Sequence, residues 1–184
     1  NSELTYEKKH EWNVGLDFGF FTNRLRGTLD VYERTTLDML LDVKVPQTTG
    51  FSTNFMNAGS MKNTGVELQL DGDIISSNDF LWTVGFNIAH NKTKILDLAV
   101  DPDENGIEKI EPSSYIHYVV GKSMYTYYLA DYYGVNPANG EALWVTEDGS
   151  LTNEYNKARK YYAGSPEPKI LGGFNTTFAW KGLQ

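Results

Sequence analysis

Residues 11–34 constrain the fold more than any other stretch, because apolar and polar side chains alternate along them with a period of two. In the first half every second residue is apolar: Trp12, Val14, Leu16, Phe18 and Phe20. Four turn-like residues, 21–24, follow, and the alternation then resumes with Leu25, Gly27, Leu29 and Val31. Successive side chains of a strand point to opposite faces of a sheet. The stretch therefore predicts a β-hairpin with one apolar face and one polar face.

The same period recurs further along the chain. We predict strands over residues 61–71, 80–89 and 169–181, and the alternation of the hairpin continues through residues 35–45 until Pro46. Residues 51–60, 72–79 and 90–164 lack the pattern and predict connections. No segment has a convincing helical period of 3.6 residues. The chain is therefore expected to be all-β and antiparallel, with about five long strands.

Composition excludes several classes of protein. The mean hydropathy is -0.44, and no apolar run approaches the ~18–20 residues that a membrane helix needs. A membrane β-barrel remains possible, because only alternate residues of its strands must be apolar. The net charge of -8 leaves no basic stripe for nucleic acid. The chain has no cysteine, which rules out disulfides and thiolate chemistry.

The connections between the expected strands alternate between short and long. They contain about four, twenty, eight and seventy-five residues in turn, counted from provisional boundaries. Transmembrane barrels show this asymmetry, with tight periplasmic turns and long extracellular loops. The pattern thus favours a segment of a transmembrane β-barrel with extracellular loops at about residues 37–59 and 90–165. A β-sandwich with uneven loops remains the alternative, because a half-buried soluble sheet alternates in the same way.

The barrel interpretation assigns roles to both faces of the strands. Aromatic rings favour the two headgroup levels of a membrane, and the residues expected there are Trp12, Phe20, Phe80, Trp82 and Trp180. Polar residues on the other face would line the lumen: Asn13, Asp17, Arg26, Asp30, Glu67, Gln69 and Asn87. Asp17, Asp30 and Glu67 could also suggest acid–base catalysis, but a charged lumen explains them more simply.

Tyrosines are concentrated in the longest expected loop. Tyr115, Tyr118, Tyr125, Tyr127, Tyr128, Tyr132 and Tyr133 fall within nineteen residues. A phenol ring offers an apolar face and a hydroxyl, which suit both sugar stacking and protein contacts. Three interpretations stay open at this point: a loop that packs on itself, contact with a partner protein, and direct contact with substrate.

One segment resembles half of a calcium-binding loop. Asp101, Asp103 and Asn105 have the ligand spacing, with Gly106 after them, but the twelfth position holds Pro112 in place of the bidentate glutamate. A solvated acidic loop is the better interpretation, so we expect no cofactor, with calcium as the minor alternative. His10, His90 and His117 show no metal-ligand spacing, and no metal site is expected from them.

Several motifs resemble the C-terminal barrel region of SusC/RagA-type TonB-linked outer-membrane receptors. The matching segments are WNVGLDFG at residues 12–19, NAGSMKNTGVEL at 57–68, FLW at 80–82, GVNP at 134–137 and GGF at 172–174. They occur in the family's order and extend over nearly the whole chain. In the longest loop the family often has an Asp/Asn/Gly-rich turn, for which this chain has only Glu147-Asp148-Gly149.

The resemblance implies a non-catalytic segment of an importer in the Gram-negative outer membrane. Such receptors import glycans or oligopeptides, work with a SusD-like surface lipoprotein, and draw energy from TonB. Their barrels have about 22 strands around a plug domain, so these residues would be one part of a longer polypeptide. The plug and the TonB-contacting region would lie in its N-terminal part. The alternative function is a secreted β-sandwich carbohydrate-binding module that uses the tyrosines, and a β-rich glycoside hydrolase is a third class.

Overall fold

The computed structural model describes residues 4–45, 48, 50–181 and 183. Their regular structure consists mainly of β-strands, which are joined by turns and by short 3₁₀ segments such as Tyr155–Lys157. None of the helices in this described part is long and apolar enough to cross a membrane. The prediction of an all-β, antiparallel chain is confirmed.

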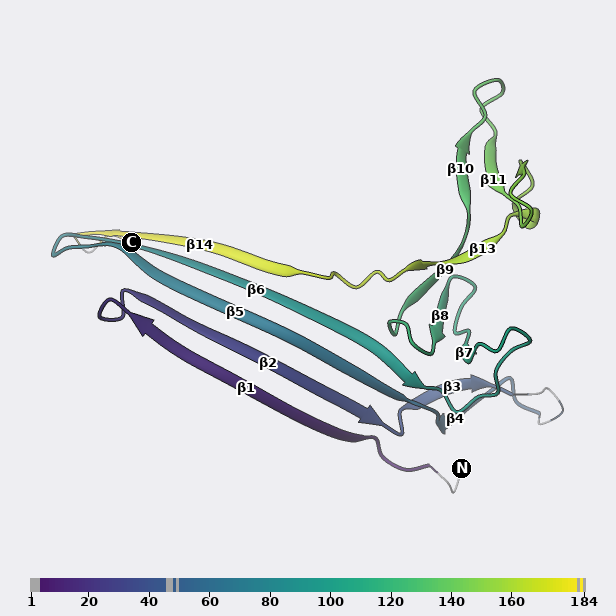
Figure 1. Cartoon of the computed structure of the whole chain (residues 1–184), viewed down its shortest axis with the longest axis horizontal. Helices are drawn as coiled ribbons and strands as arrows, with labels where there is room; N and C mark the ends of the chain where they lie inside the picture. Colours follow the sequence, from purple (N-terminus) through teal and green to yellow (C-terminus); the bar gives the residue numbers. More distant parts are fainter. Residues whose placement is uncertain (1–3, 46–47, 49, 182, 184) are drawn as a thin grey trace.

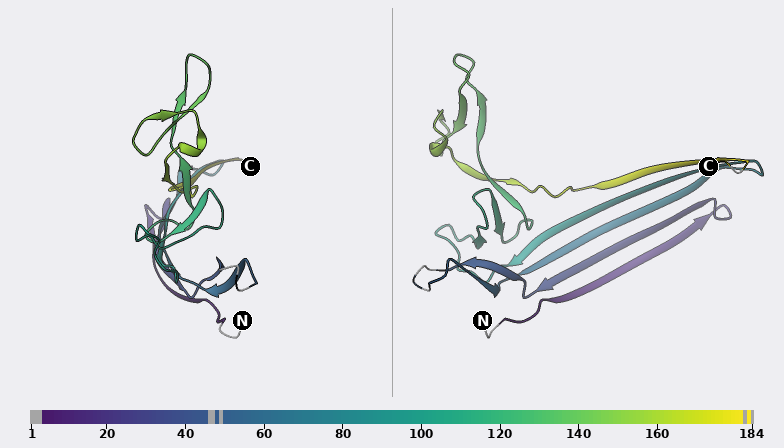
Figure 2. Two further views of the ribbon diagram at one scale, coloured as in Figure 1. Left: turned by 90° about the vertical axis from the view of Figure 1, so that its right-hand side faces the viewer. Right: turned by 180° about the vertical axis from the view of Figure 1, so that it is seen from behind.

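One long antiparallel sheet is the largest sheet of the molecule. It contains five strands in the spatial order β1 (Lys8–Phe20), β2 (Leu25–Leu37), β5 (Ser60–Ser76), β6 (Phe80–Asp97) and β14 (Leu171–Trp180). Figure 1 shows the strands side by side, with the short turns at one end of the sheet and the long connections at the other. The two views of Figure 2 show that the strands lie in a single layer.

The register of this sheet pairs apolar residues with apolar residues on the neighbouring strands. Leu16 lies opposite Leu29, Leu29 opposite Leu68, and Leu68 opposite Ile88. The neighbouring row is polar throughout: Asp17, Thr28, Gln69 and Asn87 pair in the same sequence. A slip of one residue in any pair would put the apolar side chains of one strand on the polar face. The alternation in the sequence is therefore carried across the whole sheet.

The apolar face of the sheet is uncovered. Val14 and Leu16 are 64% and 58% exposed, and neither belongs to the buried core. The other sheets within the described residues are small and gather beyond the end of the long strands (Figure 1). The two-layer sandwich that the sequence left open is therefore wrong, because no second sheet packs on this face in the described part of the chain.

The strands are longer than the ten residues expected. β1 and β2 have 13 residues each, β5 has 17 and β6 has 18. Residues 72–76, expected in a connection, belong to β5, and residues 90–97, expected in a loop, belong to β6. Backbone pairing needs no particular side-chain pattern, so these strands continue beyond the point where the period-two signal ends.

The long connections contain small sheets where the sequence predicted loops. A hairpin pairs β3 (Leu40–Lys44) with β4 (Thr53–Asn57). A four-stranded sheet has the order β13 (Lys160–Gly164), β9 (Thr126–Ala130), β8 (Ile116–Val119) and β7 (Lys109–Ile110). A three-stranded sheet contains β10 (Tyr132–Val135), β11 (Ala142–Val145) and β12 (Leu151–Thr152). Strands of two to five residues are too short for a periodic signal.

The buried core joins these connections to the sheet. Its members are Met39, Leu41, Ala58, Ile95, Leu98 and Ile110. The alternation expected through residues 35–45 is broken at Asp38, which has a φ of 57°, so β2 ends at Leu37. Met39 and Leu41 therefore pack against Ile95 in this core and do not extend the apolar face of the sheet.

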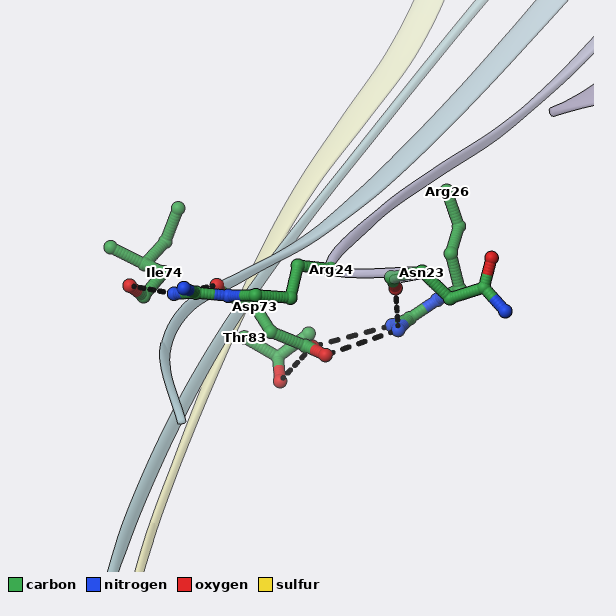
Figure 3. A network of polar contacts seen from close by, with 6 residues as sticks. All are labelled: Asn23, Arg24, Arg26, Asp73, Ile74 and Thr83. Atoms are coloured by element: carbon green, nitrogen blue, oxygen red, sulfur yellow. Dashed lines mark hydrogen bonds and ion pairs between the residues drawn. The ribbon is translucent and has the colours of Figure 1, made fainter. Parts of the chain in front are cut away.

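A polar network connects the turns at the opposite end of the sheet (Figure 3). The Arg26 guanidinium donates to the Asp73 carboxylate at 3.1 Å and to the Asn23 carbonyl at 2.9 Å. Arg24 donates to the Asp73 and Ile74 carbonyls at 3.1 and 3.0 Å, and Thr83 donates to Asp73 at 3.2 Å. Asp73, on β5, thus connects Arg24 of the β1–β2 turn and Arg26 of β2 to Thr83 of β6.

We predict that Asp73→Ala loosens this end of the sheet in the intact protein. The substitution removes the carboxylate that accepts hydrogen bonds from the Arg26 guanidinium and the Thr83 hydroxyl. Both donors then lose this partner. Amide hydrogen exchange over residues 21–26 should become about tenfold faster. Asp79→Ala, in the neighbouring turn, is the control and should change exchange little. Equal rates in the two variants would contradict a linking role for Asp73.

Candidate functional site

The polar face of the sheet is the first of two candidate surfaces. Strand alternation and register place all seven residues predicted to line a lumen on this face: Asn13, Asp17, Arg26, Asp30, Glu67, Gln69 and Asn87. Three open hollows lie along it, with volumes of about 470, 260 and 390 Å³. The structure therefore brings these residues together, while their role in a lumen remains a prediction.

Charge on this face is balanced at its ends and acidic at its centre. Arg34 forms a two-pronged ion pair with Glu11, at 2.9 and 3.0 Å, and Arg26 pairs with Asp73 at 3.1 Å. Asp30 lies directly opposite Glu67, and within the described residues neither carboxylate has an ion pair. Both carboxylates line the two smaller hollows. The centre of the wall thus presents oxygen acceptors and negative charge.

Glycines allow large rings to lie flat on the sheet. A Cβ atom at Gly65 would lie 2.2 Å from Cζ of Tyr32, the residue opposite it on the polar face. A Cβ atom at Gly27 would lie 2.3 Å from Cζ of Phe18 on the apolar face. Both rings therefore cover the backbone of the neighbouring strand, which only glycine permits.

The predicted membrane-interface aromatics all lie on the apolar face. Phe20 and Phe80 adjoin the two short turns, and Trp180 lies opposite Phe80. Trp82 stacks on Phe178 at 5.4 Å, and its Nε1 donates to the Thr176 hydroxyl at 2.8 Å. Trp12 lies toward the other end of β1. Phe178 links Trp82 to Phe80 and was missed among the predicted site residues, although the period of two places it on the same face.

The tyrosines of the long connection separate into two groups. Tyr128, on β9, stacks on the buried His117 at 4.5 Å and contacts Tyr162 at 5.1 Å. Tyr118 packs edge-on against Tyr125 at 6.1 Å and contacts the buried core. Burial raises the pKa of Tyr118 and of Tyr162. The strands of the four-stranded sheet carry Tyr118, Tyr127, Tyr128 and Tyr162, and Tyr125 lies just before β9. Together these rings pack the connection on itself.

The second group projects away from the long sheet. Tyr132 contacts Trp144 at 5.2 Å, and Trp144 contacts Tyr155 at 5.2 Å. Tyr132, Tyr133 and Val135 are all more than half exposed, as is Tyr115 before β8. The structure therefore does not unite the seven predicted tyrosines in one surface. Trp144 and Tyr155 were missed, because strands this short carry no pattern that would relate them to Tyr132.

The acidic segment near residue 103 forms a turn with internal partners. The Asp103 carboxylate accepts from the backbone amides of Asn105 and Ile107 at 2.9 and 3.0 Å, and it pairs with Lys109 at 3.0 Å. The Ile107 amide and the Lys109 ammonium hold the pKa of this carboxyl below its usual range. The described residues contain no group of three or more His, Asp or Glu side chains that could hold a metal ion. The expectation of a solvated acidic loop, with calcium at Asp101, Asp103 and Asn105 as the minor alternative, stays a prediction.

The sheet is a single layer of antiparallel strands with one apolar face and one polar face, and it has short turns at one end and long connections at the other. This is the architecture of a transmembrane β-barrel wall. Residues 1–177 match the family model of the TonB dependent receptor-like β-barrel. The chain belongs to this family, as its motifs indicated.

Relatives and solved structures place it in the SusC/RagA group. It is 31% identical to TonB-dependent receptor SusC of Bacteroides thetaiotaomicron, over 98% of this chain and 19% of that protein. It is 28% identical to TonB-dependent receptor P26 of Formosa agariphila, over 100% of this chain and 20% of the relative. A structure of the RagAB peptide transporter superimposes with a TM-score of 0.82 at 35% identity, covering 99% of this chain and 20% of that one. The chain thus spans about a fifth of the length of these proteins.

We predict that the two tyrosine groups respond differently to substitution. Tyr128→Ala removes the ring between His117 and Tyr162, which should destabilise the four-stranded sheet by about 1–2 kcal/mol. Tyr133→Ala removes an exposed ring and should leave that sheet intact. Limited proteolysis of the long connection in the intact receptor measures the difference. Equal protease sensitivity of the two variants would show that Tyr128 does not hold the connection together.

Proposed function

We propose that this chain forms part of the barrel wall of a TonB-dependent importer in the outer membrane of a Gram-negative bacterium. The observation that carries this proposal is the register of the long sheet, which gives an uncovered apolar face and a polar face over the same strands. In a bilayer the apolar face contacts acyl chains and the polar face lines the interior. The family match supports the same assignment.

The two ends of the sheet set the orientation of the wall. The tight turns at residues 21–24 and 77–79 face the periplasm, and the long connections with their small sheets face the cell exterior, as in other barrels of this type. The rings of Phe20, Phe80 and Trp180 then lie at the periplasmic interface.

The cargo we propose is a large nutrient, either a glycan or an oligopeptide. SusC is a TonB-dependent receptor and RagAB is a peptide transporter or importer. The polar face suits both cargoes, because its carboxylates and amides accept hydrogen bonds from sugar hydroxyls or from peptide N–H groups. Asp30 and Glu67 form no ion pair within the described residues, so their negative charge disfavours anionic cargo and favours neutral or cationic molecules.

The mechanism is selective permeation without chemical conversion of the cargo. A plug domain in the rest of the polypeptide would block the lumen, and TonB would displace it through the N-terminal region. A SusD-like lipoprotein would cover the extracellular mouth. The exposed surface of Tyr132, Tyr133 and Val135 is the part of this chain that we assign to contact with that lipoprotein.

Growth measurements test the cargo assignment. A strain that lacks the receptor gene should lose growth on either oligopeptides or one class of glycan as the limiting nutrient, and the intact gene should restore it. Co-purification of a surface lipoprotein that is lost on combined Tyr132→Ser and Tyr133→Ser substitution tests the partner. Unimpaired growth of the deletion strain on every such nutrient would contradict an import function.

We predict that one charge on the apolar face prevents assembly and that the same charge one residue later does not. Leu68→Lys places an ammonium near the middle of the acyl layer, at a cost of about 2–4 kcal/mol. Gln69→Lys places it on the polar face, in water. Outer-membrane fractionation with heat-modifiable gel mobility should show loss of the folded receptor for Leu68→Lys alone. Equal assembly of both variants would contradict contact between Leu68 and lipid.

A further inference from the structure

Four lysines of this acidic chain gather around one hollow. Lys92, Lys94, Lys122 and Lys169 line a hollow of about 380 Å³ at the long-connection end of the sheet, together with His90 and one carboxylate, Glu167. The whole chain has 24 Asp and Glu residues against 16 Lys and Arg residues, so a cluster of positive charge is unexpected from its composition.

Three segments build this hollow at the place where β14 separates from β6. Their pairing ends at Leu171 opposite Ala89, and above this point residues 121–122 take the free edge of β6. The Ile95 amide donates to the Lys122 carbonyl at 2.9 Å, and the Gly121 amide donates to the Ile95 carbonyl at 2.9 Å. The Lys169 carbonyl accepts from Nδ1 of His90. Backbone contacts therefore hold the three segments that carry the lysines.

The positive charge of the hollow is largely uncompensated. No ion pair joins Lys92, Lys94 or Lys169 to a carboxylate anywhere in residues 4–45, 48, 50–181 and 183. Glu167 accepts from the Ser123 and Ser165 hydroxyls. Lys122 lies over the Tyr162 ring at 5.1 Å. Like charges held together are unfavourable without a counter-ion, so the arrangement favours an anion between them.

The position of the lysines along β6 indicates which kind of molecule would carry that anion. Strand alternation puts His90, Lys92 and Lys94 on the same side of β6 as Phe86 and Ile88, which is the apolar face. Their partners on β5 are Val66, Thr64 and Lys62. Lys62 itself pairs with Glu33 at 2.9 Å. At ~3.3 Å per residue, Lys92 lies ~13 Å beyond Ile88 along the strand. For a strand tilted by about 40° from the barrel axis, this separation is roughly 10 Å along the axis. Lys92 and Lys94 are exposed just above the apolar band.

We propose that this hollow binds the phosphate groups of an anionic lipid in the leaflet that adjoins the long-connection end of the barrel. The lysines bind phosphate, and the apolar face below Lys92 contacts the acyl chains of the same molecule. This inference rests on the proposed function, because it needs the barrel wall to be inserted with this end outward.

The test uses the intact receptor in phosphatidylcholine nanodiscs, with phosphorylated lipid A as the probe and native mass spectrometry as the measurement of bound lipid. Receptor with Lys92→Gln and Lys94→Gln should bind lipid A about tenfold more weakly than wild type. The control carries Lys157→Gln and Lys160→Gln, which change the net charge equally in the outer part of the connection and should bind as wild type does. Dephosphorylated lipid A should not be retained.

Three results would overturn the lipid site: equal lipid A binding by the two double variants, equal retention of dephosphorylated lipid A, or protection of Lys92 and Lys94 from acetylation by inorganic phosphate alone. The last result would indicate a site for soluble anions. Heat-modifiable mobility and protease protection are measured on every sample. Failure of the wild-type receptor to insert would contradict the proposed function, whereas insertion without lipid preference contradicts only this inference.

Discussion

The structure depends on backbone pairing along one sheet, because that pairing decides which side of the wall each side chain occupies. Leu29, Leu68 and Ile88 share one row, and Thr28, Gln69 and Asn87 share the next. In a bilayer no water satisfies unpaired backbone groups, so strands cross it only within a closed sheet. β1 and β14 are the outer strands here. Each needs a further strand beside it, which agrees with a chain that spans about a fifth of its relatives' length.

The two ends of the sheet are built differently. At the turn end, exposed arginines and Asp73 join neighbouring strands through charge-assisted hydrogen bonds. At the other end, the core around Ile95 ties the β3–β4 hairpin and the long connection to β6. The apolar core of this molecule therefore lies at the long-connection end of the sheet. Most of the sheet's apolar surface therefore stays uncovered.

The sequence predicted the long sheet well because one physical signal determines it. Alternation along residues 12–20 and 64–70 identified both faces, and the register of the structure carries that pattern from strand to strand. The same signal failed at residues 90–97 of β6, because residues 90–94 are polar on both faces and the apolar Ile95 and Leu96 are consecutive. It failed again at Met39 and Leu41, because the left-handed backbone at Asp38 redirects them into the core.

The candidate surfaces were predictable to different degrees. The residues of the polar face followed directly from alternation. The division of the tyrosines did not, because Tyr128 meets His117 and Tyr162 through strands of four or five residues that give no periodic signal. The lysine hollow also depends on contacts between segments up to about eighty residues apart, such as that between His90 and Lys169. Such proximity arises only from the three-dimensional fold.

The most direct test of the central claim is a cysteine scan of residues 66–71 on β5 in the intact, reconstituted receptor. The chain contains no cysteine of its own, so each introduced thiol can carry a single spin label. The collision rate with oxygen, which concentrates in lipid, should be high at residues 66, 68 and 70. The collision rate with a water-soluble nickel complex should be high at residues 67, 69 and 71. Equal water accessibility at all six positions, or burial of the even positions from both reagents, would contradict a lipid-facing barrel wall.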